Sequence, residues 1–395
     1  MTGQYDLVVA GGGLVGSAFA ALLADRCPDL SIAVVESRPF SGHYQDSEFD
    51  PRVVALTETS RQLLVQIGVW PAIAERRVAP YTHMSVWDAD GTGFIEFDSS
   101  DVGALCLGHI VENSNIVGAL QQRLQQLANI DWICPAKVAQ VEQQNNQISI
   151  ELDNSEQLSS TLLVAADGAL SSVRDLCGFQ LDDTPYGHSA IVATVRCQHP
   201  HSNTARQWFA SDGPLAFLPL PEKHSISFVW SQREQKADEL MALSDEEFCT
   251  QLTRASSACL GTVESVSKRF CFPLHQRHTS DYVQPGIALL GDAAHTIHPL
   301  AGQGVNLGFK DVIALVDELQ RASQRGLPLG DMSVLGRYQR QRKPDNLATM
   351  LAMKGFKELF ASDNLEVRLL RNEGMSLVNR MGLVKKQLVR QAMGL

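Results

Sequence analysis

Apolar residues in the first 36 positions alternate between short continuous runs and one longer stretch. Residues 5–10 form the first run, glycines follow it, and an Ala/Leu-rich stretch then continues to about residue 25. Residues 31–35 form a second apolar run. Short apolar runs bounded by glycine are typical of buried parallel strands, and a longer apolar stretch between two of them is typical of a helix. The N-terminal segment therefore predicts a βαβ unit.

The same strand-to-helix pattern returns twice further along the chain. Residues 160–166 are apolar and lead into Asp167-Gly168, and residues 287–290 lead into Gly291-Asp292. After the second of these comes a Gly-rich loop and then a long apolar-periodic helix. An aspartate at the carboxyl end of a parallel strand lies where open α/β sheets bind ligands, although Asp167 could instead cap the next helix.

A different pattern occupies the middle of the chain. Residues 82–98 alternate polar and apolar positions around Asp90-Gly91, which predicts a hairpin. Residues 186–232 are β-rich, aromatic and divided by Gly/Pro turns, which predicts an antiparallel sheet closed by helices at 233–257 and a strand at 263–272. From Ser333 onward the pattern is helical, with Pro344 as a predicted break or kink.

These patterns together predict an α/β fold in which a Rossmann-like domain is interrupted by a smaller sheet. The predicted parts are a discontinuous nucleotide-binding domain of residues 1–80, 101–182 and 271–345, a β-rich substrate domain of residues 81–100 and 183–270, and C-terminal helices of residues 346–395.

The first glycines carry a specific binding pattern. Gly11, Gly13 and Gly16 form G-x-G-x-x-G between the first strand and helix, and Glu36 ends the second strand 20 residues after Gly16. In a βαβ unit this spacing brings a diphosphate to the helix N-terminus and a carboxylate to a ribose. The sequence therefore predicts a dinucleotide site.

Two further features suit an anionic ligand. The loop at residues 291–306 supplies glycines that let the backbone approach a ligand at a helix N-terminus. Arg52 precedes a predicted helix and has the planar fork that binds phosphate oxygens, although pairing with Asp50 or Glu58 is an equal alternative.

Composition narrows the function classes. The chain has 395 residues, 44% of them hydrophobic, and a net charge of -11, which argues against nucleic-acid binding. The eight cysteines include no C-x-x-C pair, so neither a zinc site nor a disulfide framework is predicted. No apolar run reaches the roughly 18 residues of a spanning helix, and a cytoplasmic protein is expected.

Three separated motifs, GGGLVG with Glu36, VAADG with Arg174, and GDAAHTIHPLAGQGVNLG, occur in one chain. This combination is typical of the single-component flavin-dependent aromatic hydroxylases with the para-hydroxybenzoate hydroxylase fold, which the sequence resembles along nearly its whole length. GHIVENS, LAFLPL and the terminal LVRQAMGL resemble the ubiquinone-biosynthesis hydroxylases most, in particular the bacterial 2-octaprenylphenol hydroxylases. The resemblance implies that FAD is reduced by NAD(P)H, that molecular oxygen gives a flavin hydroperoxide, and that the aromatic ring of a polyprenylphenol is hydroxylated.

The resemblance also implies a cofactor role for each motif residue. Glu36 is expected on the adenosine ribose, Arg52 near the diphosphate, and Asp292, with Asn113 opposite, on the ribityl chain. The segment from Pro299 to Asn306 is expected around the flavin ring. The full set of expected FAD contacts is Gly11, Gly13, Gly16, Glu36, Arg52, Asn113, Asp167, Gly168, Arg174, Gly291, Asp292, Pro299, Gly302, Gln303, Gly304, Val305 and Asn306.

The substrate side is less defined. The resemblance implies a substrate wall made by Phe217, Leu218, Pro219 and Pro299, and no side chain identifies itself as the catalytic base. His295 and His298 in the flavin loop are candidates for a general base or, together with Asp292, for a metal site. A third metal ligand at typical spacing is not visible in the sequence. We therefore predict no metal site.

Other functions stay open. A two-dinucleotide-fold oxidoreductase would need a second G-x-G-x-x-G, which the chain lacks. A non-catalytic flavoprotein subunit, and a hydroxylase of another ubiquinone intermediate or of a soluble phenol, remain alternatives.

The C-terminus suggests partners. Residues 365–395 hold six basic and two acidic side chains in an acidic protein, which fits either a solvated helix face or a docking surface for membrane or protein. The expected partners are a prenylated phenol, a ubiquinone-biosynthesis complex, the surface of the inner membrane, and a second copy of the chain.

Overall fold

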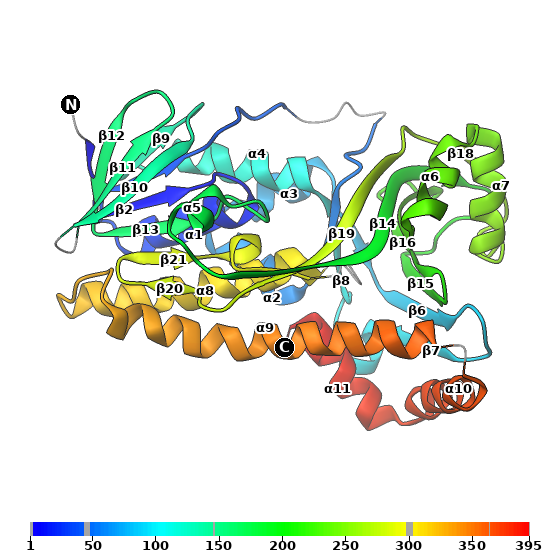
Figure 1. The fold of residues 1–395 in the computed structure, drawn as a ribbon. Coiled ribbons are helices and arrows are strands. Elements are labelled where there is room, and N and C mark those ends of the chain that lie inside the picture. The colour runs from blue at the N-terminus through cyan, green and yellow to red at the C-terminus, as the bar shows by residue number, and fades with distance from the viewer. Residues whose placement is uncertain (1–2, 43–47, 145–146, 298–302, 363, 395) are drawn as a thin grey trace.

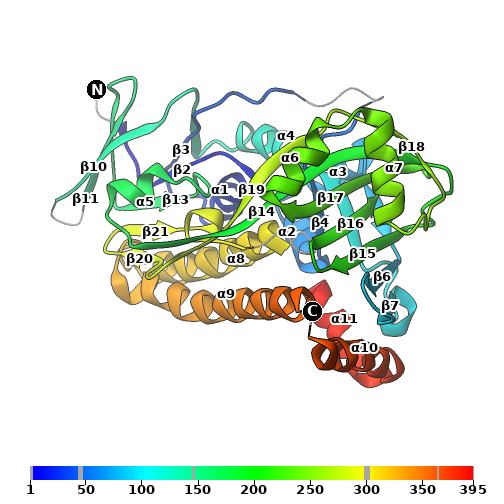
Figure 2. The ribbon, with the colours of Figure 1, turned by 45° about the vertical axis from the view of Figure 1, so that its right-hand side comes forward.

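Two large sheets, one at each end of the molecule, organise the chain, and a long helix runs beneath both (Figures 1 and 2). The computed structural model describes residues 3–42, 48–144, 147–297, 303–362 and 364–394. All eight cysteines are free.

The first sheet has six strands and forms the core of the cofactor domain. Its strands, in spatial order, are β20 (Val283–Gln284), β21 (Ile287–Leu289), β13 (Leu162–Ala165), β2 (Leu7–Ala10), β3 (Ile32–Val35) and β9 (Ile130–Ile133). All neighbours are parallel except β20 and β21. Strands β2, β3, β13 and β21 are buried at every residue, as expected of a parallel sheet covered on both faces.

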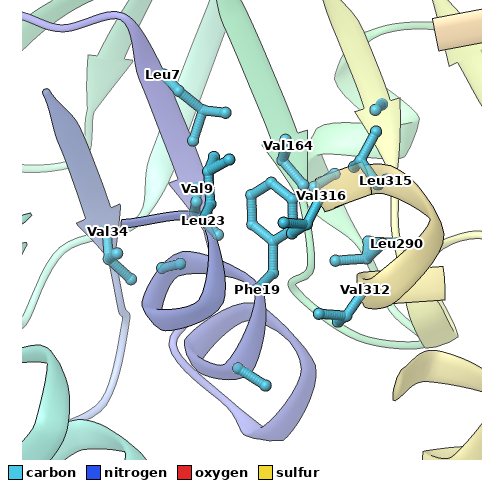
Figure 3. Packing of buried hydrophobic residues seen from close by; sticks show 14 of the residues in the cluster. Leu7, Val9, Phe19, Leu23, Val34, Val164, Leu290, Val312, Leu315 and Val316 are labelled. Carbon is cyan, nitrogen blue, oxygen red and sulfur yellow. The ribbon is translucent and has the colours of Figure 1, made fainter. Parts of the chain in front are cut away.

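Helices cover this sheet and complete its core. They are α1 (Leu14–Arg26), α2 (Glu58–Gln66), α3 (Trp70–Arg76), α4 (Asn113–Leu124), α5 (Ser172–Leu176) and α8 (Gln303–Gln324). Helix α1 packs between the sheet, α4 and α8, which explains why it is apolar on every side. In Figure 3, Phe19 of α1 lies beside Val164 of β13 and Val316 of α8.

Two smaller sheets flank the cofactor domain. One contains β1 (Gly3–Gln4), β12 (Gln157–Ser160), β11 (Gln147–Leu152) and β10 (Val138–Gln144). The other contains β4 (Val53–Leu56), β8 (Gly108–Glu112) and β5 (Ala79–Tyr81). Residues 160–166, predicted as one strand, are divided between β12 and β13, because β12 pairs in the four-stranded sheet and β13 in the central one.

The second large sheet has nine strands and builds the substrate domain. They are β22 (His295–Thr296), β19 (Phe270–Thr279), β14 (Leu181–Cys197), β17 (Ser225–Arg233), β16 (Gly213–Pro219), β15 (Thr204–Ala210), β6 (His83–Asp88) and β7 (Phe94–Asp98), with β18 (Val263–Val266) paired to β14. The predicted hairpin is β6–β7. Strands β14 and β19 run from one domain to the other as a long ribbon (Figure 1). The sheet therefore continues past the predicted boundary at residue 270.

Helices cover the outer face of this sheet and extend along the molecule's underside. Helices α6 (Glu234–Ala242) and α7 (Asp245–Ala255) lie on the outer face (Figure 2), where α7 starts at a capping box between Ser244 and Glu247. Single-turn helices occur at Ser99–Val102 and Gly291–Ala293. The C-terminal helices are α9 (Met332–Ala361), α10 (Leu365–Arg380) and α11 (Gly382–Met393).

Helix α9 differs from the prediction. It is one helix that includes Pro344, so a break there is excluded, the alternative of a kink stays a prediction, and the predicted boundary at 345/346 falls inside the helix. Packing of Tyr338 and Arg342 on the cofactor domain compensates for the backbone hydrogen bond that proline removes, since both side chains are buried.

Candidate active site

The carboxyl ends of four adjacent strands bring the sequence motifs together. Strands β21, β13, β2 and β3 are neighbours and parallel, so Gly291, Asp167, Gly11 and Glu36 meet along one edge of the sheet. Backbone hydrogen bonds from Leu290 N to Ala165 O (2.9 Å) and from Gly11 N to Val35 O (2.8 Å) continue the register to this edge. Ligands of open α/β sheets bind at such an edge.

The three glycines of the first motif have three different structural roles. Gly11 turns the chain with a φ of 102°, and a Cβ there would lie 2.4 Å from Ala166 O. At Gly16 a Cβ would lie 1.9 Å from Gly11 O, so this glycine permits the close packing of α1. At Gly13, the N-cap of α1, a Cβ would meet no atom within 4 Å. Gly13 thus presents bare backbone and the helix N-terminus to open space, as a diphosphate requires.

Glu36 lies against this loop. Its Oε2 accepts a hydrogen bond from Gly12 N at 2.7 Å, and its Oε1 accepts one from Arg38 N at 2.9 Å. The carbonyl of Gly12 in turn accepts a hydrogen bond from Gln121 Nε2 at 2.9 Å. The carboxylate is therefore held beside the helix N-terminus, where a ribose hydroxyl can reach it. Gln121, on α4, was not identified from the sequence.

Asp167 offers an unfilled acceptor at the same edge. Its Oδ2 accepts hydrogen bonds from Val173 N (3.2 Å) and Ser172 Oγ (3.3 Å). Its Oδ1 is buried and has no partner among the described residues. A Cβ on Gly168 would meet nothing within 4 Å. The N-cap of α5 is Ser171, and Asp167 Oδ2 accepts from a further N–H of the first turn of this helix, while Oδ1 is left for a ligand.

Arg174 lies behind this motif. It is 2% exposed, and its Nη1 donates to Ala169 O (3.1 Å) and Ala293 O (3.4 Å). The side chain ties the Asp167 loop to the Asp292 loop. Its expected cofactor contact stays a prediction, and the geometry favours a positioning role.

Asp292 is a polar side chain that the described part of the second loop presents outward. The residue is exposed to solvent, yet many protein atoms surround the carboxyl, and this desolvation raises the pKa of Asp292. Solvent exposure and partial desolvation occur together when a side chain is reached by solvent on one side and surrounded by protein atoms on the others. Its side chain forms no hydrogen bond with a described residue, which leaves it available for a ligand hydroxyl.

The start of α8 faces the same space. A Cβ on Gly304 would meet nothing within 4 Å, and Val305 packs against the central core. Asn306 is buried: its Oδ1 accepts from Ser60 Oγ (2.6 Å), and its Nδ2 donates to Ala55 O (2.8 Å). Its amide therefore fixes α8 to β4 and α2. Pro299, Gly302 and His298 lie outside the described residues, and for Gln303 only the backbone is described.

Arg52, which directly precedes β4, lies beside Asn113, the first residue of α4, since Asn113 N donates to Arg52 O at 2.9 Å. The Arg52 guanidinium is 65% exposed and lies 3.8 Å from Asp50 Oδ1, so the alternative pairing with Asp50 is long and weak. Asn113 is half-buried, and its amide has no hydrogen bond within the described ranges. Both side chains remain available to a ligand.

The expected substrate wall divides across one strand. Phe217 is fully buried on the outer face of the sheet, with its ring 5.2 Å from Trp208 under α6 and α7. Leu218 points to the opposite face and packs with Leu220, Ile110 and Tyr81. Alternation along β16 explains the division. Phe217 and Leu218 therefore cannot line the same pocket, and the wall assignment stays a prediction for which Leu218 is the better placed of the two. Pro219 is buried.

His295 lies in a buried network. The residue is 2% exposed, and its Nε2 lies 2.6 Å from Asp311 Oδ2. Across the part of the chain that the structure describes, no three His, Cys, Asp or Glu side chains are grouped to hold a metal ion. Asp311 and its partner Arg342 were not identified from the sequence, although an acidic residue on the apolar face of a helix was the available signal.

Comparison with known proteins identifies the ligand. The family described as FAD binding domain matches residues 4–350. The 3-demethoxyubiquinol 3-hydroxylase of Escherichia coli is 34% identical over 396 residues, which covers 100% of both chains. The chain belongs to the FAD-dependent hydroxylases of ubiquinone biosynthesis. The ubiquinone hydroxylase UbiL of Rhodospirillum rubrum is 33% identical to the chain described here, and the alignment covers 98% of this chain and 89% of the relative.

The fold agrees with this assignment. The crystal structure of pqsL, a probable FAD-dependent monooxygenase from Pseudomonas aeruginosa, covers 94% of the hydroxylase and 99% of its own chain with a TM-score of 0.80 at 22% identity. The predicted family, fold class and FAD cofactor are confirmed. NAD(P)H and molecular oxygen are the typical cosubstrates of the class.

The described residues fit FAD. Bare backbone at Gly13, Gly168 and Gly304 faces open space, and neither Asp167 Oδ1 nor the Asp292 carboxylate has a hydrogen-bond partner among the residues that the structure describes. These features supply the helix N-terminal donors and the free acceptors that a dinucleotide with ribose and ribityl hydroxyls needs.

Proposed function

We propose that the hydroxylase acts on the aromatic ring of a polyprenylphenol in ubiquinone biosynthesis. The supporting observation is an apolar cluster beside the start of α8. Its buried members are Ala55, Ala79, Ile110 and Leu220, with Phe49, Val53, Tyr81 and Leu218 packed against them. The charged group that contacts this cluster is the Arg77 guanidinium, which lies 4.8 Å from the Phe49 ring and is paired with Glu112, with 2.8 Å between Arg77 Nε and Glu112 Oε2. Because this charge is already neutralised by a protein carboxylate, the cluster suits a neutral prenylated ring better than an aromatic carboxylate.

The main arginines of the β-rich domain that could bind a substrate carboxylate are Arg196 and Arg206. Arg206 Nη1 donates to His201 O and Thr204 O, both at 3.0 Å, and shares the outer face of the sheet with Phe217. Arg196 is 54% exposed and lies 3.5 Å from Glu264. The Arg206 guanidinium is therefore bound to backbone carbonyls and not free to pair with a substrate carboxylate, which favours a substrate without one.

The protein itself contributes by positioning the cofactor and the substrate ring, by excluding water from the ring, and by stabilising negative charge near the cofactor. When bound, FAD supplies electron transfer from NAD(P)H and activation of molecular oxygen. The N-terminus of α8 stabilises negative charge near the cofactor, and the apolar cluster excludes water from the ring. Burial raises the pKa of Tyr81 to about 12, so its phenol stays protonated and does not act as the base.

The Escherichia coli relative supports a second substrate, 3-demethoxyubiquinol, because that relative is named for this reaction and matches the whole chain. A strain lacking the protein separates the two substrates. Accumulation of a polyprenylphenol without the ring hydroxyl supports the first substrate, and accumulation of a demethoxyubiquinol supports the second. Normal ubiquinone without either intermediate contradicts both.

We also propose that the C-terminal helices dock on an anionic membrane surface. On α10, Leu370 (74% exposed) and Leu377 (59%) lie two helical turns apart on one face, and Met381 (44%) follows at the C-cap. Arg380, Lys386 and Arg390 are exposed nearby in sequence. Apolar side chains beside basic ones suit anionic headgroups. None of the helices among the described residues is long and apolar enough to cross a bilayer.

Vesicle sedimentation tests this docking. The change L370E/L377E should abolish binding to vesicles containing anionic lipid, while L327E, a matched exposed leucine before α9 at 38% exposure, should leave it unchanged. Equal binding of the double variant and the parent protein would contradict the proposal. Binding to a second copy of the chain or to a ubiquinone-biosynthesis complex, with no vesicle binding, would also contradict it.

A further inference from the structure

Asp311 of α8 is the centre of a buried polar network between α8, α9 and the Asp292 loop. The residue is 0% exposed. Its Oδ1 accepts hydrogen bonds from Arg342 Nε at 2.7 Å and Asn346 Nδ2 at 3.2 Å. Its Oδ2 lies 2.6 Å from His295 Nε2 and accepts from Gly291 N at 3.3 Å. Both oxygens are therefore fully used by protein groups.

The two contacts of Oδ2 flank Asp292. Gly291 directly precedes Asp292, and His295 follows it three positions later. Other contacts fix the same segment, since Thr279 Oγ1 donates to Ala294 O at 3.1 Å and Arg174 Nη1 to Ala293 O. In this loop the side chain of Asp292 points outward while its neighbours are anchored inward. One carboxylate on α8 thus sets the path of the loop that carries the outward carboxylate.

Charge balance shows that Asp311 is an ionised anchor. Burial alone would raise the pKa of Asp311, but the charges of His295 and Arg342 and their hydrogen bonds outweigh it and hold this pKa below its usual value. Arg342 is also buried, and its Nη2 donates to Asn346 Oδ1 at 2.7 Å. Apolar packing often stabilises a fold as well as a buried ion pair does. The property that distinguishes this ion pair is that its hydrogen bonds fix the orientation of the groups that it joins.

We propose that Asp311 and His295 are positioning residues for the flavin. Asp311 lies on the helix whose N-terminus faces the cofactor, and it holds the loop that presents Asp292. The network therefore fixes the distance between the helix N-terminus and the Asp292 carboxylate, two groups that act on the same ligand. This inference rests on FAD binding and is independent of which phenol is the substrate.

Variants at His295 test the proposal. H295Q keeps a donor at the Nε2 position, whereas H295L keeps the bulk and removes the donor. We expect H295L to bind FAD at least about tenfold more weakly, with a changed visible spectrum and reduction potential of the bound flavin, and H295Q to stay within about threefold of the parent protein. Affinity is measured by titrating apoprotein with FAD, so no hydroxylation is needed.

Glu318 provides a matched control on the same helix. It lies roughly two turns further along α8, is 5% exposed, and pairs with Arg321 and with Arg337 of α9, away from the loop. E318Q should lower the melting temperature without changing FAD affinity or flavin potential. If H295L changes only the melting temperature, as E318Q does, the network is merely structural and the proposal is overturned.

A second variant, H295N, keeps the proposal testable if H295L does not fold. H295N retains an amide but is too short to reach Asp311 from the same backbone, so it should reproduce the weaker FAD binding expected of H295L. Parent-like FAD affinity and flavin potential in folded H295N would overturn the proposal. A loss of hydroxylation with unchanged FAD affinity and flavin potential would overturn this role alone, because hydroxylation by the parent protein tests the proposed substrate separately.

Discussion

Gly13→Ala separates the binding role of the first glycine motif from its role in the fold. A Cβ at Gly13 would meet no protein atom within 4 Å, and the residue has φ -76° and ψ -163°, which alanine adopts without strain. Alanine is a poorer N-cap than glycine, but it also restricts the unfolded chain, and these effects of about 0.5–1 kcal/mol have opposite signs. The apoprotein should therefore keep its stability to within about 1 kcal/mol.

The effect on FAD should be much larger. The added methyl group occupies the space in which the diphosphate meets the N-terminus of α1, so contacts of the phosphate oxygens with the helix donors are lost. We expect FAD to bind about 100-fold more weakly, which corresponds to about 2.8 kcal/mol. Fluorescence titration of apoprotein with FAD measures this change, and thermal unfolding of the same apoprotein measures the stability.

Gly16→Ala is the opposite control. Its Cβ would lie 1.9 Å from Gly11 O, so the backbone must shift and the apoprotein should lose about 1–3 kcal/mol or more of stability. Unchanged FAD affinity in Gly13→Ala would refute the placement of the diphosphate. A Gly13→Ala apoprotein as unstable as Gly16→Ala would refute the assignment of separate jobs to the two glycines.

Three further predictions concern other parts of the molecule. Glu36→Arg places a cation at the ribose acceptor and removes the partner of Gly12 N, so the purified protein should carry little flavin; parent-like flavin content would exclude this role. Phe217→Ala should cost about 3–5 kcal/mol of stability with KM for the phenol unchanged, whereas Leu218→Ala should raise KM at little cost in stability; the reverse pattern would restore Phe217 to the wall. Burial lowers the pKa of His278 from 6.5 to about 4, so the unfolded chain binds the proton first as pH falls, and stability should drop by about 2 kcal/mol between pH 7 and pH 5. Urea unfolding at the two pH values should show a drop that is smaller by about 2 kcal/mol in His278→Gln than in the parent protein. The drop that remains in the variant includes the contributions of His109 and His201, whose pKa values burial also lowers.

The cofactor domain was predictable because local sequence determines it. Buried parallel strands are continuous apolar runs, and the residues after them, from Gly11 to Glu36 and at Asp167 and Asp292, follow from the strand ends. The hairpin at residues 82–98 was likewise confirmed because its turn residues and alternation are local signals.

Features that depend on distant partners were missed or wrong. The face toward which Phe217 points depends on the α6 and α7 helices that cover one side of the sheet. Helix α9 continues through Pro344 because its packing on the cofactor domain offsets the local cost of proline. The pairing of Asp311 with Arg342 joins two helices 31 positions apart, and no local pattern specifies it.

The C-terminal helices show the same limit. Their basic excess was visible in the sequence, but the anchor was not: Arg371 is buried and its Nη2 lies 2.6 Å from Asp88 Oδ2 of β6. Removal of residues 365–395 would leave Asp88 buried without this partner, so loss of the helices would damage the substrate domain as well as any docking surface. Point changes on the exposed face are therefore the cleaner test of membrane contact.

Isotope labelling tests the central claim, hydroxylation of an aromatic ring by an FAD-dependent enzyme, most directly. FAD-loaded protein is supplied with NAD(P)H, ¹⁸O₂ and a prenylated phenol, and the product is examined by mass spectrometry. The account predicts a ring hydroxyl that carries one ¹⁸O atom and NAD(P)H oxidation stimulated by the phenol. A product whose new oxygen comes from water, or NAD(P)H oxidation that no prenylated phenol stimulates, would contradict it.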